Sequence, residues 1–162
     1  MQARHSDRKK YFNEQALTTR KYVIPYLHDL IEINENTSVL EIGCGEAGNL
    51  VPFLDMGCKR VVGIDISEGR IENGKLYHSD HPNYKNLELI AEDIYDTETT
   101  EEFDIIISRD VIEHIPNQEK FMNRCRDFMK PNGLYFIGFP PWYNPFGGHQ
   151  QLLKHKLFSK LP

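Results

Sequence analysis

The residues best suited to chemistry stand in the segment VLEIGCGEAGN, residues 39 to 49. An apolar run ends there in Glu41-x-Gly43-x-Gly45, a pattern typical of a buried parallel strand that leads into a glycine turn. Glycines at such a turn let backbone N–H groups at the start of the next helix approach a ligand closely. The segment therefore predicts a binding site for an adenosine-containing cofactor.

The glycines alone fit two kinds of cofactor. Gly43, Gly45 and Gly48 also satisfy G-x-G-x-x-G, the fingerprint of dinucleotide-binding enzymes. Glu41 separates the two, because a carboxylate in a buried strand is costly unless it is hydrogen-bonded or paired with a cation. The ammonium group of S-adenosylmethionine is such a cation, whereas the pyrophosphate of NAD or FAD would be repelled. The alternative is a Glu41 side chain satisfied by nearby backbone groups.

Five motifs in order resemble the class I S-adenosylmethionine-dependent methyltransferases over residues 37 to 140. They are VLEIGCG, KRVVGIDIS, NLELIAEDIYD, EFDIIISRDVIEHIPN and MKPNGLYFIGFP. The resemblance implies an α/β, Rossmann-like, doubly wound sheet of strand order 3-2-1-4-5, without the family's last two strands. One departure is Ala47, where many members have a third glycine; alanine can serve if its φ stays negative.

The resemblance also implies which residues bind the donor, S-adenosylmethionine. The expected set is Glu41, Gly43, Cys44, Gly45, Asp65, Ile66, Asp93, Ile94, Ser108 and Arg109. Glu41 would hold the ammonium group, the glycines would admit the donor's backbone, and Asp65 would bind the ribose. Asp93 would meet the adenine amino group with Ile94 beside the ring, and Ser108 with Arg109 would hold the methionyl end. Cys44 is interpreted as a small packing residue of the turn and not as a nucleophile.

On the acceptor side, an oxygen nucleophile requires a base or a metal ion to remove its proton. Asp110, Glu113 and His114 follow the predicted fourth strand, within the fourth motif, as D-x-x-E-H. This segment resembles a loop of ubiquinone-biosynthesis O-methyltransferases that is associated with a divalent metal. On one helical turn the three side chains would share a face. We predict His114 as a catalytic residue and assign no metal site; a divalent metal and a purely structural His114 remain the alternatives.

A second candidate on the acceptor side is the aromatic, glycine-rich segment PPWYNPFGGHQQ, residues 140 to 151. His149 is predicted as its catalytic residue, and Trp142, Tyr143 and Phe146 as pocket walls. The alternatives are a loop that buries its own aromatic residues, or a linker. Tyr11 and Phe12 could close the same pocket from the N-terminal side.

Composition limits the classes of partner. A net charge of −5 and a pI near 5.8 argue against nucleic acid, and the basic residues near the N-terminus fit a solvated helix face. The 3 cysteines lack disulfide or metal spacing, which favours a reducing compartment. No apolar segment approaches the ~20 residues of a membrane span. We therefore expect a cytoplasmic enzyme with a small-molecule acceptor, with a homodimer as one possible state.

Apolar periodicity predicts alternating helices and strands. A helical region over residues 8–33, interrupted at Pro25, is followed by strands at 38–42, 60–64, 87–91, 103–107 and 133–139, with helices at 47–56, 67–78 and 117–129 and a turn at 131–133. The domain hypothesis is an N-terminal helical cover (1–36), a donor-binding core (37–140) and an acceptor-side, truncated C-terminal segment (141–162). Too few residues follow Pro140 for two more strands, so a fragment is expected, with a minimal form as the alternative.

These observations predict a methyltransferase that uses S-adenosylmethionine and methylates a small molecule, more readily at oxygen than at nitrogen or carbon. The first alternative is a nicotinamide-dependent oxidoreductase, which rests on G-x-G-x-x-G alone. The second is a non-catalytic module that binds the donor or a partner protein.

Overall fold

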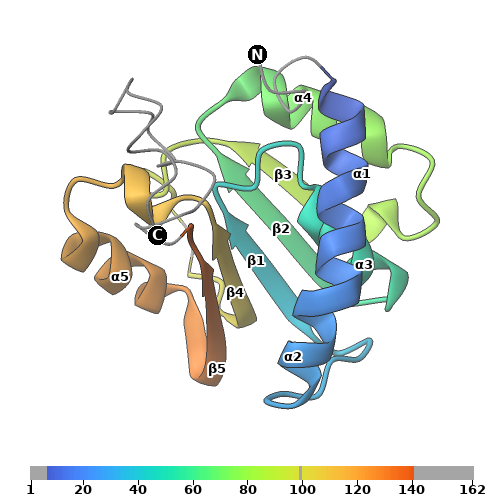
Figure 1. The fold of residues 1–162 in the computed structure, drawn as a ribbon. Coiled ribbons are helices and arrows are strands. Elements are labelled where there is room, and N and C mark those ends of the chain that lie inside the picture. Colours follow the sequence, from blue (N-terminus) through green and yellow to red (C-terminus); the bar gives the residue numbers. More distant parts are fainter. Residues whose placement is uncertain (1–6, 99, 141–162) are drawn as a thin grey trace, which may run out of the picture.

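The computed structural model describes residues 7–98 and 100–140. Its centre is a parallel 5-stranded sheet of order β3-β2-β1-β4-β5 (Figure 1). The strands are β1 (Ser38–Ile42), β2 (Arg60–Asp65), β3 (Leu87–Ala91), β4 (Phe103–Arg109) and β5 (Met129–Gly138). The predicted Rossmann-like sheet and its strand order are confirmed.

Helices cover both faces of the sheet, with α5 on the face opposite α1 to α4 (Figure 1). They are α1 (Arg8–Thr18), a π-helical turn (Thr19–Val23), α2 (Ile24–His28), a 3-10 turn (Gly48–Leu50), α3 (Val51–Asp55), α4 (Glu68–His78), 3-10 turns at Tyr84–Asn86 and Ile112–His114, and α5 (Gln118–Asp127). Within this part of the chain, no helix has the length and apolar character needed to cross a membrane.

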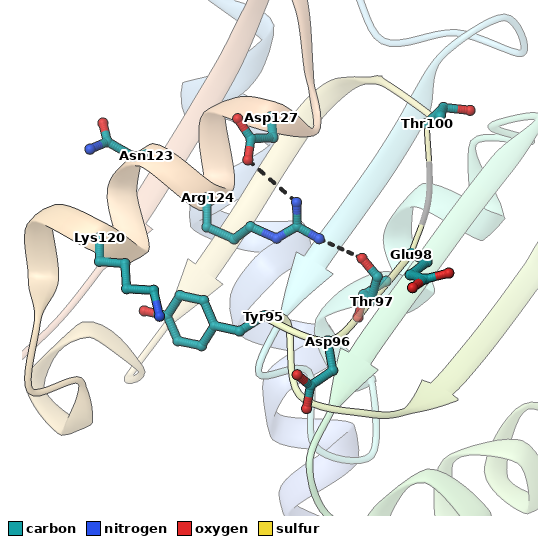
Figure 2. Close-up of a pocket in the computed structure, with 9 residues that line it drawn as sticks. All are labelled: Tyr95, Asp96, Thr97, Glu98, Thr100, Lys120, Asn123, Arg124 and Asp127. Atoms are coloured by element: carbon teal, nitrogen blue, oxygen red, sulfur yellow. Dashed lines mark hydrogen bonds and ion pairs between the residues drawn. The ribbon is translucent and has the colours of Figure 1, made fainter.

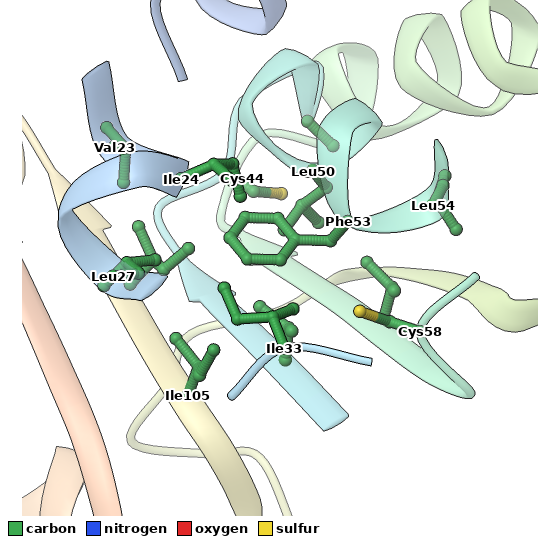
Figure 3. Close-up of a cluster of buried hydrophobic side chains, with 14 of the residues drawn as sticks. Val23, Ile24, Leu27, Ile33, Cys44, Leu50, Phe53, Leu54, Cys58 and Ile105 are labelled. Atoms are coloured by element: carbon green, nitrogen blue, oxygen red, sulfur yellow. The ribbon is translucent and has the colours of Figure 1, made fainter. Parts of the chain in front are cut away.

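The strands are apolar on both faces because each face is packed. Val39 of β1 belongs to the cluster under α2, α3 and α4, which Figure 3 shows around Phe53, whereas its neighbour Leu40 belongs to the cluster under α5. Successive side chains of a strand point to opposite faces, so a strand covered on both sides shows a continuous apolar run. Glu41 interrupts that run, and its side chain is only 1% exposed.

Several predicted boundaries differ from the structure. The helix expected at 47–56 starts as a 3-10 turn and becomes α-helical only at Val51. The turn expected at 131–133 is not a separate turn but a shift in the pairing of β5 with β4. Phe103 pairs with Met129, whereas Ile105, two residues later, pairs with Leu134, five residues later. Pro131 cannot donate to the ladder, which explains why the pairing shifts there.

The N-terminal helical region is divided near Pro25, as expected, into two shorter α-helices, α1 and α2, which a π-helical turn joins. The π-helical turn precedes α2, and Pro25 occupies its first turn, where a missing N–H is tolerated. Of the apolar residues in this region, Val23 and Leu27 are buried, whereas Tyr26 is 56% exposed and Leu30 55% exposed. Tyr26 contacts the ring of Phe136 on β5, with ring centroids 6.0 Å apart. An apolar surface therefore remains where α2 meets the sheet edge.

Candidate functional site

The polar residues predicted to bind a ligand gather at one edge of the sheet. Glu41 lies near the end of β1, Asp65 ends β2, Asp93 follows β3 and Arg109 ends β4. Because these strands are parallel, their carboxyl ends meet at the same edge, visible as the arrowheads in Figure 1. The four polar residues predicted from the sequence therefore lie at the same end of the sheet.

The turn after β1 has three residues in the left-handed region. Gly43 has φ +72°, Gly45 +58° and Ala47 +61°. The condition stated for alanine at this position, a negative φ, is therefore not met. The bend is held by hydrogen bonds of the Ala47 backbone: its N–H donates to the Cys44 carbonyl at 2.8 Å, and its carbonyl lies 3.1 Å from His78 Nε2. A tight turn held this way tolerates a residue whose Cβ makes left-handed backbone unfavourable.

Gly43 also allows the turn to contact the loop after β4. A Cβ built at Gly43 would stand 2.4 Å from Cγ2 of Val111, closer than packed atoms approach. Cys44 is buried on the inner side of the turn, beside Gly63. Burial raises the pKa of the Cys44 thiol well above its ordinary value. Cys44 is therefore a neutral packing residue in the geometry of the turn.

Asp65 closes the glycine turn from the neighbouring strand. Its Oδ2 accepts a hydrogen bond from Gly45 N at 2.8 Å, and its Oδ1 accepts one from Ser67 N at 2.9 Å. The side chain is 7% exposed, whereas the next residue, Ile66, is 78% exposed. An apolar side chain this exposed, next to a carboxylate at the carboxyl edge, suits contact with a ligand that has both a polar and a flat apolar part.

Glu41 is a strongly perturbed carboxyl group of the site. Its Oε1 accepts a hydrogen bond from Asn49 Nδ2 at 2.6 Å, and its Oε2 is buried without a hydrogen-bond partner among the described residues. Burial raises the pKa of Glu41 to about 8, although Asn49 and Arg109 both act to lower it and Asp65 acts to raise it. A buried carboxyl with one unpartnered oxygen is a strong candidate for contact with a cation.

Ser108 and Arg109, expected to act together, point to opposite faces of the sheet. Arg109 Nη1 donates to Asn49 Oδ1 at 2.7 Å and to Thr19 Oγ1 at 3.1 Å. Ser108 Oγ lies 2.9 Å from the Tyr135 hydroxyl, on the side of α5. Asn49 and Thr19 were missed by the sequence analysis. The sequence did hold a signal for a role of Asn49 in the site: it is a polar residue at the start of a helix that must pack on the sheet.

The loop after β3 is held by α5. Asp93 Oδ1 accepts from Tyr95 N at 2.9 Å, and Arg124 Nε donates to the Ile94 carbonyl at 2.9 Å. Ile94 is 6% exposed and packs in the core under α5, so its side chain is not open to a ligand as Ile66 is. Arg124, also missed from sequence, fixes the backbone that follows Asp93.

A cavity of about 1210 Å³ lies between this loop and α5 (Figure 2). Lys120 stands over the Tyr95 ring at 4.3 Å, and Arg124 reaches from Asp127 to the Thr97 carbonyl. None of the predicted donor-binding residues lines it. The cavity is open and carries both signs of charge, so we assign the ligand to the carboxyl edge, where the glycine turn and the carboxylates converge.

The loop after β4 does not form the expected shared helical face. Asp110 has φ +56° and precedes the 3-10 turn that contains Glu113 and His114. His114 is 52% exposed, and its Nε2 lies 4.0 Å from Glu113 Oε1. Across residues 7–98 and 100–140, no three His, Cys, Asp or Glu side chains form a group that could hold a metal ion. The idea that these three residues share one helical turn is therefore wrong.

Other predicted acceptor-side residues fall into two groups. His149, Trp142, Tyr143 and Phe146 lie outside the described residues. Phe12 is 5% exposed and packs its ring against Tyr77 and His78 of α4, with centroids 5.3 and 5.1 Å apart. In this structure Phe12 thus joins α1 to α4, whereas Tyr11 is half-buried beside Arg8.

Comparisons with known proteins point to one family. A family model described as a methyltransferase domain matches residues 33–156. A ubiquinone biosynthesis O-methyltransferase from Rhodopseudomonas palustris (strain TIE-1) is 36% identical over 107 residues, covering 64% of this chain and 40% of that protein. The structure of PKMT2 from Rickettsia typhi in complex with AdoHcy is 34% identical, with a TM-score of 0.59, covering 64% of this chain and 20% of that chain.

A more distant structure, YjhP from E. coli, is 20% identical with a TM-score of 0.63, and covers 81% of this chain and 51% of that chain. At this identity the likeness shows the fold alone. The chain spans 40% of the length of the Rhodopseudomonas relative and 20% of PKMT2.

Proposed function

The chain belongs to the methyltransferase domain family, and from that premise we propose that it transfers a methyl group from S-adenosylmethionine to a small-molecule acceptor. The observation that carries this proposal is the buried Glu41 carboxyl, whose Oε2 has no hydrogen-bond partner among the described residues. A buried carboxylate oxygen needs a hydrogen-bond donor or a cation. The ammonium group of this donor meets that need, and a pyrophosphate does not.

The surrounding residues fit the rest of the donor. Gly43 and Gly45 have left-handed backbone conformations in the turn after β1, where the absence of a side chain would let the donor approach the backbone. We assign the ribose hydroxyls to Asp65 and one face of the adenine to Ile66, which is 78% exposed beside it. The carboxylate of Asp65 already orders the turn through Gly45 N, so the same group would bind ribose and hold the turn closed.

Two further contacts complete the assignment. We assign the adenine amino group to Asp93, with Ile94 behind it as a core residue that fixes the loop. We assign the methionyl carboxylate to Arg109, with the backbone of Ser108 beside it. When bound, S-adenosylmethionine supplies an electrophilic methyl group on its sulfonium. The residues of the chain orient that group toward the acceptor and exclude water, which accounts for much of the catalysis that a nucleophilic acceptor requires.

We further propose oxygen as the acceptor atom. The support is the 36% identical relative named a ubiquinone biosynthesis O-methyltransferase. An oxygen acceptor must lose its proton, and we assign that step to His114, which is half exposed in the loop that follows β4. His149 is the second candidate and lies outside the described residues.

We propose a cytoplasmic location and no nucleic-acid partner. All of Cys44, Cys58 and Cys125 are free and buried, as expected for a protein kept under reducing conditions. The net charge of −5 would oppose binding to a polyanion.

Calorimetric titration tests the donor assignment. S-adenosylhomocysteine should bind with micromolar-class affinity, and NADH should not. If NADH bound more tightly, the nicotinamide oxidoreductase would be the better assignment. Transfer from radiolabelled S-adenosylmethionine to a panel of small phenols and amines then tests catalysis.

In that transfer assay, His114→Ala should lower kcat by about 100-fold or more, the scale of losing a general base. The matched control is His28→Ala, which removes an exposed histidine at the end of α2. Donor binding without transfer to any acceptor in the panel would favour a non-catalytic module. Full activity of His114→Ala would remove His114 from the chemistry.

A further inference from the structure

A buried amide connects the two charged groups of the donor site. Asn49 donates from Nδ2 to Glu41 Oε1 and accepts at Oδ1 from Arg109 Nη1 and from Thr19 Oγ1, at distances of 2.6, 2.7 and 2.9 Å. Asn49 is 2% exposed and Thr19 is 1% exposed, so water does not compete for these bonds. One end of this amide therefore binds the Glu41 carboxyl group, and the other end binds the Arg109 guanidinium.

The sheet register explains why these groups meet. Glu41 pairs with Ile107 across β1 and β4. Paired residues of parallel strands share a face, and Arg109 is two residues beyond Ile107, so Glu41 and Arg109 point to the same face. Asn49 comes between them from the turn that precedes α3. Without that amide, the carboxyl and the guanidinium could pair directly and neutralise each other.

We propose, building on the function proposed above, that Asn49 is a positioning residue for the amino-acid end of the donor. It holds Glu41 and Arg109 apart, so that Glu41 Oε2 receives the donor's ammonium group and Arg109 receives its carboxylate. Binding thereby converts neutral Glu41 to its carboxylate and releases one proton to solvent. Thr19 supports this role by orienting the Asn49 carbonyl from the helical cover.

The direction of the pH dependence follows from the groups that face Glu41. These are Arg109 from β4, Asp65 from β2 and Cys44 in the turn. Since burial raises the pKa of Glu41 to about 8 in the free protein, Glu41 is mostly protonated at pH 6 to 7. The donor's α-ammonium, with an ordinary pKa of about 7.7–8.0, is also protonated there. Pairing the two requires loss of the Glu41 proton, so affinity rises with pH in this window.

Calorimetry with S-adenosylhomocysteine, which has the same amino-acid end, measures this coupling. In the wild-type chain at pH 6.5, titrations in two buffers of different ionisation enthalpy should show release of about one proton. The dissociation constant should fall by about tenfold from pH 6 to pH 7. Glu41→Gln should bind without proton release and with little pH dependence between pH 6 and 7.5.

Variants of the amide network separate positioning from general stability. Asn49→Ala should weaken binding at pH 7 by about 10- to 100-fold, the scale of losing hydrogen bonds to charged groups. It should also move the rising part of the pH profile to higher pH, because the Asn49 bond that lowers the pKa of Glu41 is lost. The control is Asn86→Ala, which removes a 2.9 Å hydrogen bond to the Cys58 carbonyl near the amino ends of β2 and β3. This variant should change neither the affinity nor the pH profile.

A second pair of variants applies if Asn49→Ala does not fold. Thr19→Val should reproduce the shift of the pH profile in weaker form, whereas Thr19→Ser, which keeps the hydroxyl, should restore the wild-type profile. Binding without proton release, or equal behaviour of the Asn49→Ala and Asn86→Ala variants, would overturn this inference alone. Failure of the wild-type chain to bind S-adenosylhomocysteine at any pH would overturn the proposed function as well.

Discussion

Asp65 holds two loops of the site in place in addition to its proposed contact with the donor. Its two carboxylate oxygens accept from Gly45 N and Ser67 N, which lie on different loops of the carboxyl edge. Hydrogen bonds to a charged acceptor are about twice as strong as neutral ones. Asp65 therefore orders the glycine turn through these two bonds, and its proposed contact with the ribose would use the same carboxylate.

Replacement of Asp65 by alanine should show both effects. Asp65→Ala should lower the free energy of unfolding by about 2–4 kcal/mol, because two backbone N–H groups lose a charged partner. It should weaken S-adenosylhomocysteine binding by at least about tenfold. Denaturant unfolding and calorimetry measure the two quantities.

The matched control is Asp104→Ala, near the amino end of β4 and thus at the end of the sheet opposite to the site. Asp104 accepts from Ser38 N, Ser38 Oγ and Lys130 Nζ at 2.7 to 2.8 Å, so its loss should also destabilise the protein. Affinity should stay within about twofold, since Asp104 is remote from the ligand. Equal loss of affinity in both variants would mean that Asp65 acts only through stability.

At the residue scale, sequence reasoning succeeded where position along a strand determined position in space. Glu41, Asp65 and Arg109 could be placed together because each stands near the carboxyl end of a parallel strand. Asn49 and Thr19 could not be paired this way, because their contact joins residues 30 apart through the packing of a helix on a turn. No spacing rule encodes that contact, so the network under Glu41 appeared only in the structure.

At the scale of elements, α1 and the turn before α3 are packed backbone against backbone. A Cβ built at Gly48 would lie 2.4 Å from the carbonyl oxygen of Phe12 and 3.0 Å from Gln15. The buried Glu46 of the same turn forms an ion pair with Arg8 at the start of α1. The N-terminal helix α1 therefore packs directly against the glycine turn and helps to hold it in place.

Substitution at Gly48 should displace that helix. Gly48→Ala should lower the free energy of unfolding by about 1–3 kcal/mol, the cost of overpacking against a neighbour that cannot yield. It should also weaken donor binding, because Asn49 and the turn move with α1. Thermal unfolding and calorimetry provide the measurements.

Gly69→Ala is the control for this substitution. Nothing lies within 4 Å of a Cβ at Gly69, which is in α4. Alanine in an exposed helix is favoured over glycine, so this variant should gain up to about 1 kcal/mol. A neutral Gly48→Ala variant would show that α1 is free to shift away from the turn.

Elements were predicted well where apolar runs were short and bounded by turn residues. The strands at 38–42 and 87–91 have the predicted limits. The fifth strand was predicted from residue 133 because Pro131, Asn132 and Gly133 are typical turn residues. In the structure β5 already begins at Met129, and Asn132 has φ +66° inside the irregularity. Pairing of Met129 with Phe103 determines that start, and pairing partners are not visible in a single segment.

On the scale of the whole molecule, the two edges of the sheet differ in charge. At the β3 edge, Arg60 forms ion pairs with Glu88 and Glu101. At the β5 edge, the stretch LYFIG (134–138) has no charged residue. A hollow of about 330 Å³ lies there between α2 and β5, and its lining residues are Tyr26, Leu30, Leu134, Tyr135, Phe136 and Ile137. Charged side chains protect a sheet edge from pairing with another chain, and among the described residues the β5 stretch 134–138 lacks them.

The 162-residue chain should therefore self-associate through the β5 edge as its concentration rises, which also tests the expectation of a homodimer. Leu30→Lys places a charge in the apolar hollow at a position that is 55% exposed, so it should weaken association without destabilising the fold.

Leu76→Lys is the matched control, because Leu76 is 68% exposed on α4, away from that edge. Sedimentation velocity over a concentration series should show a smaller associated fraction for Leu30→Lys, and wild-type behaviour for Leu76→Lys. A wild-type chain that stays monomeric at every concentration, or equal effects of the two lysines, would mean that this edge does not mediate association.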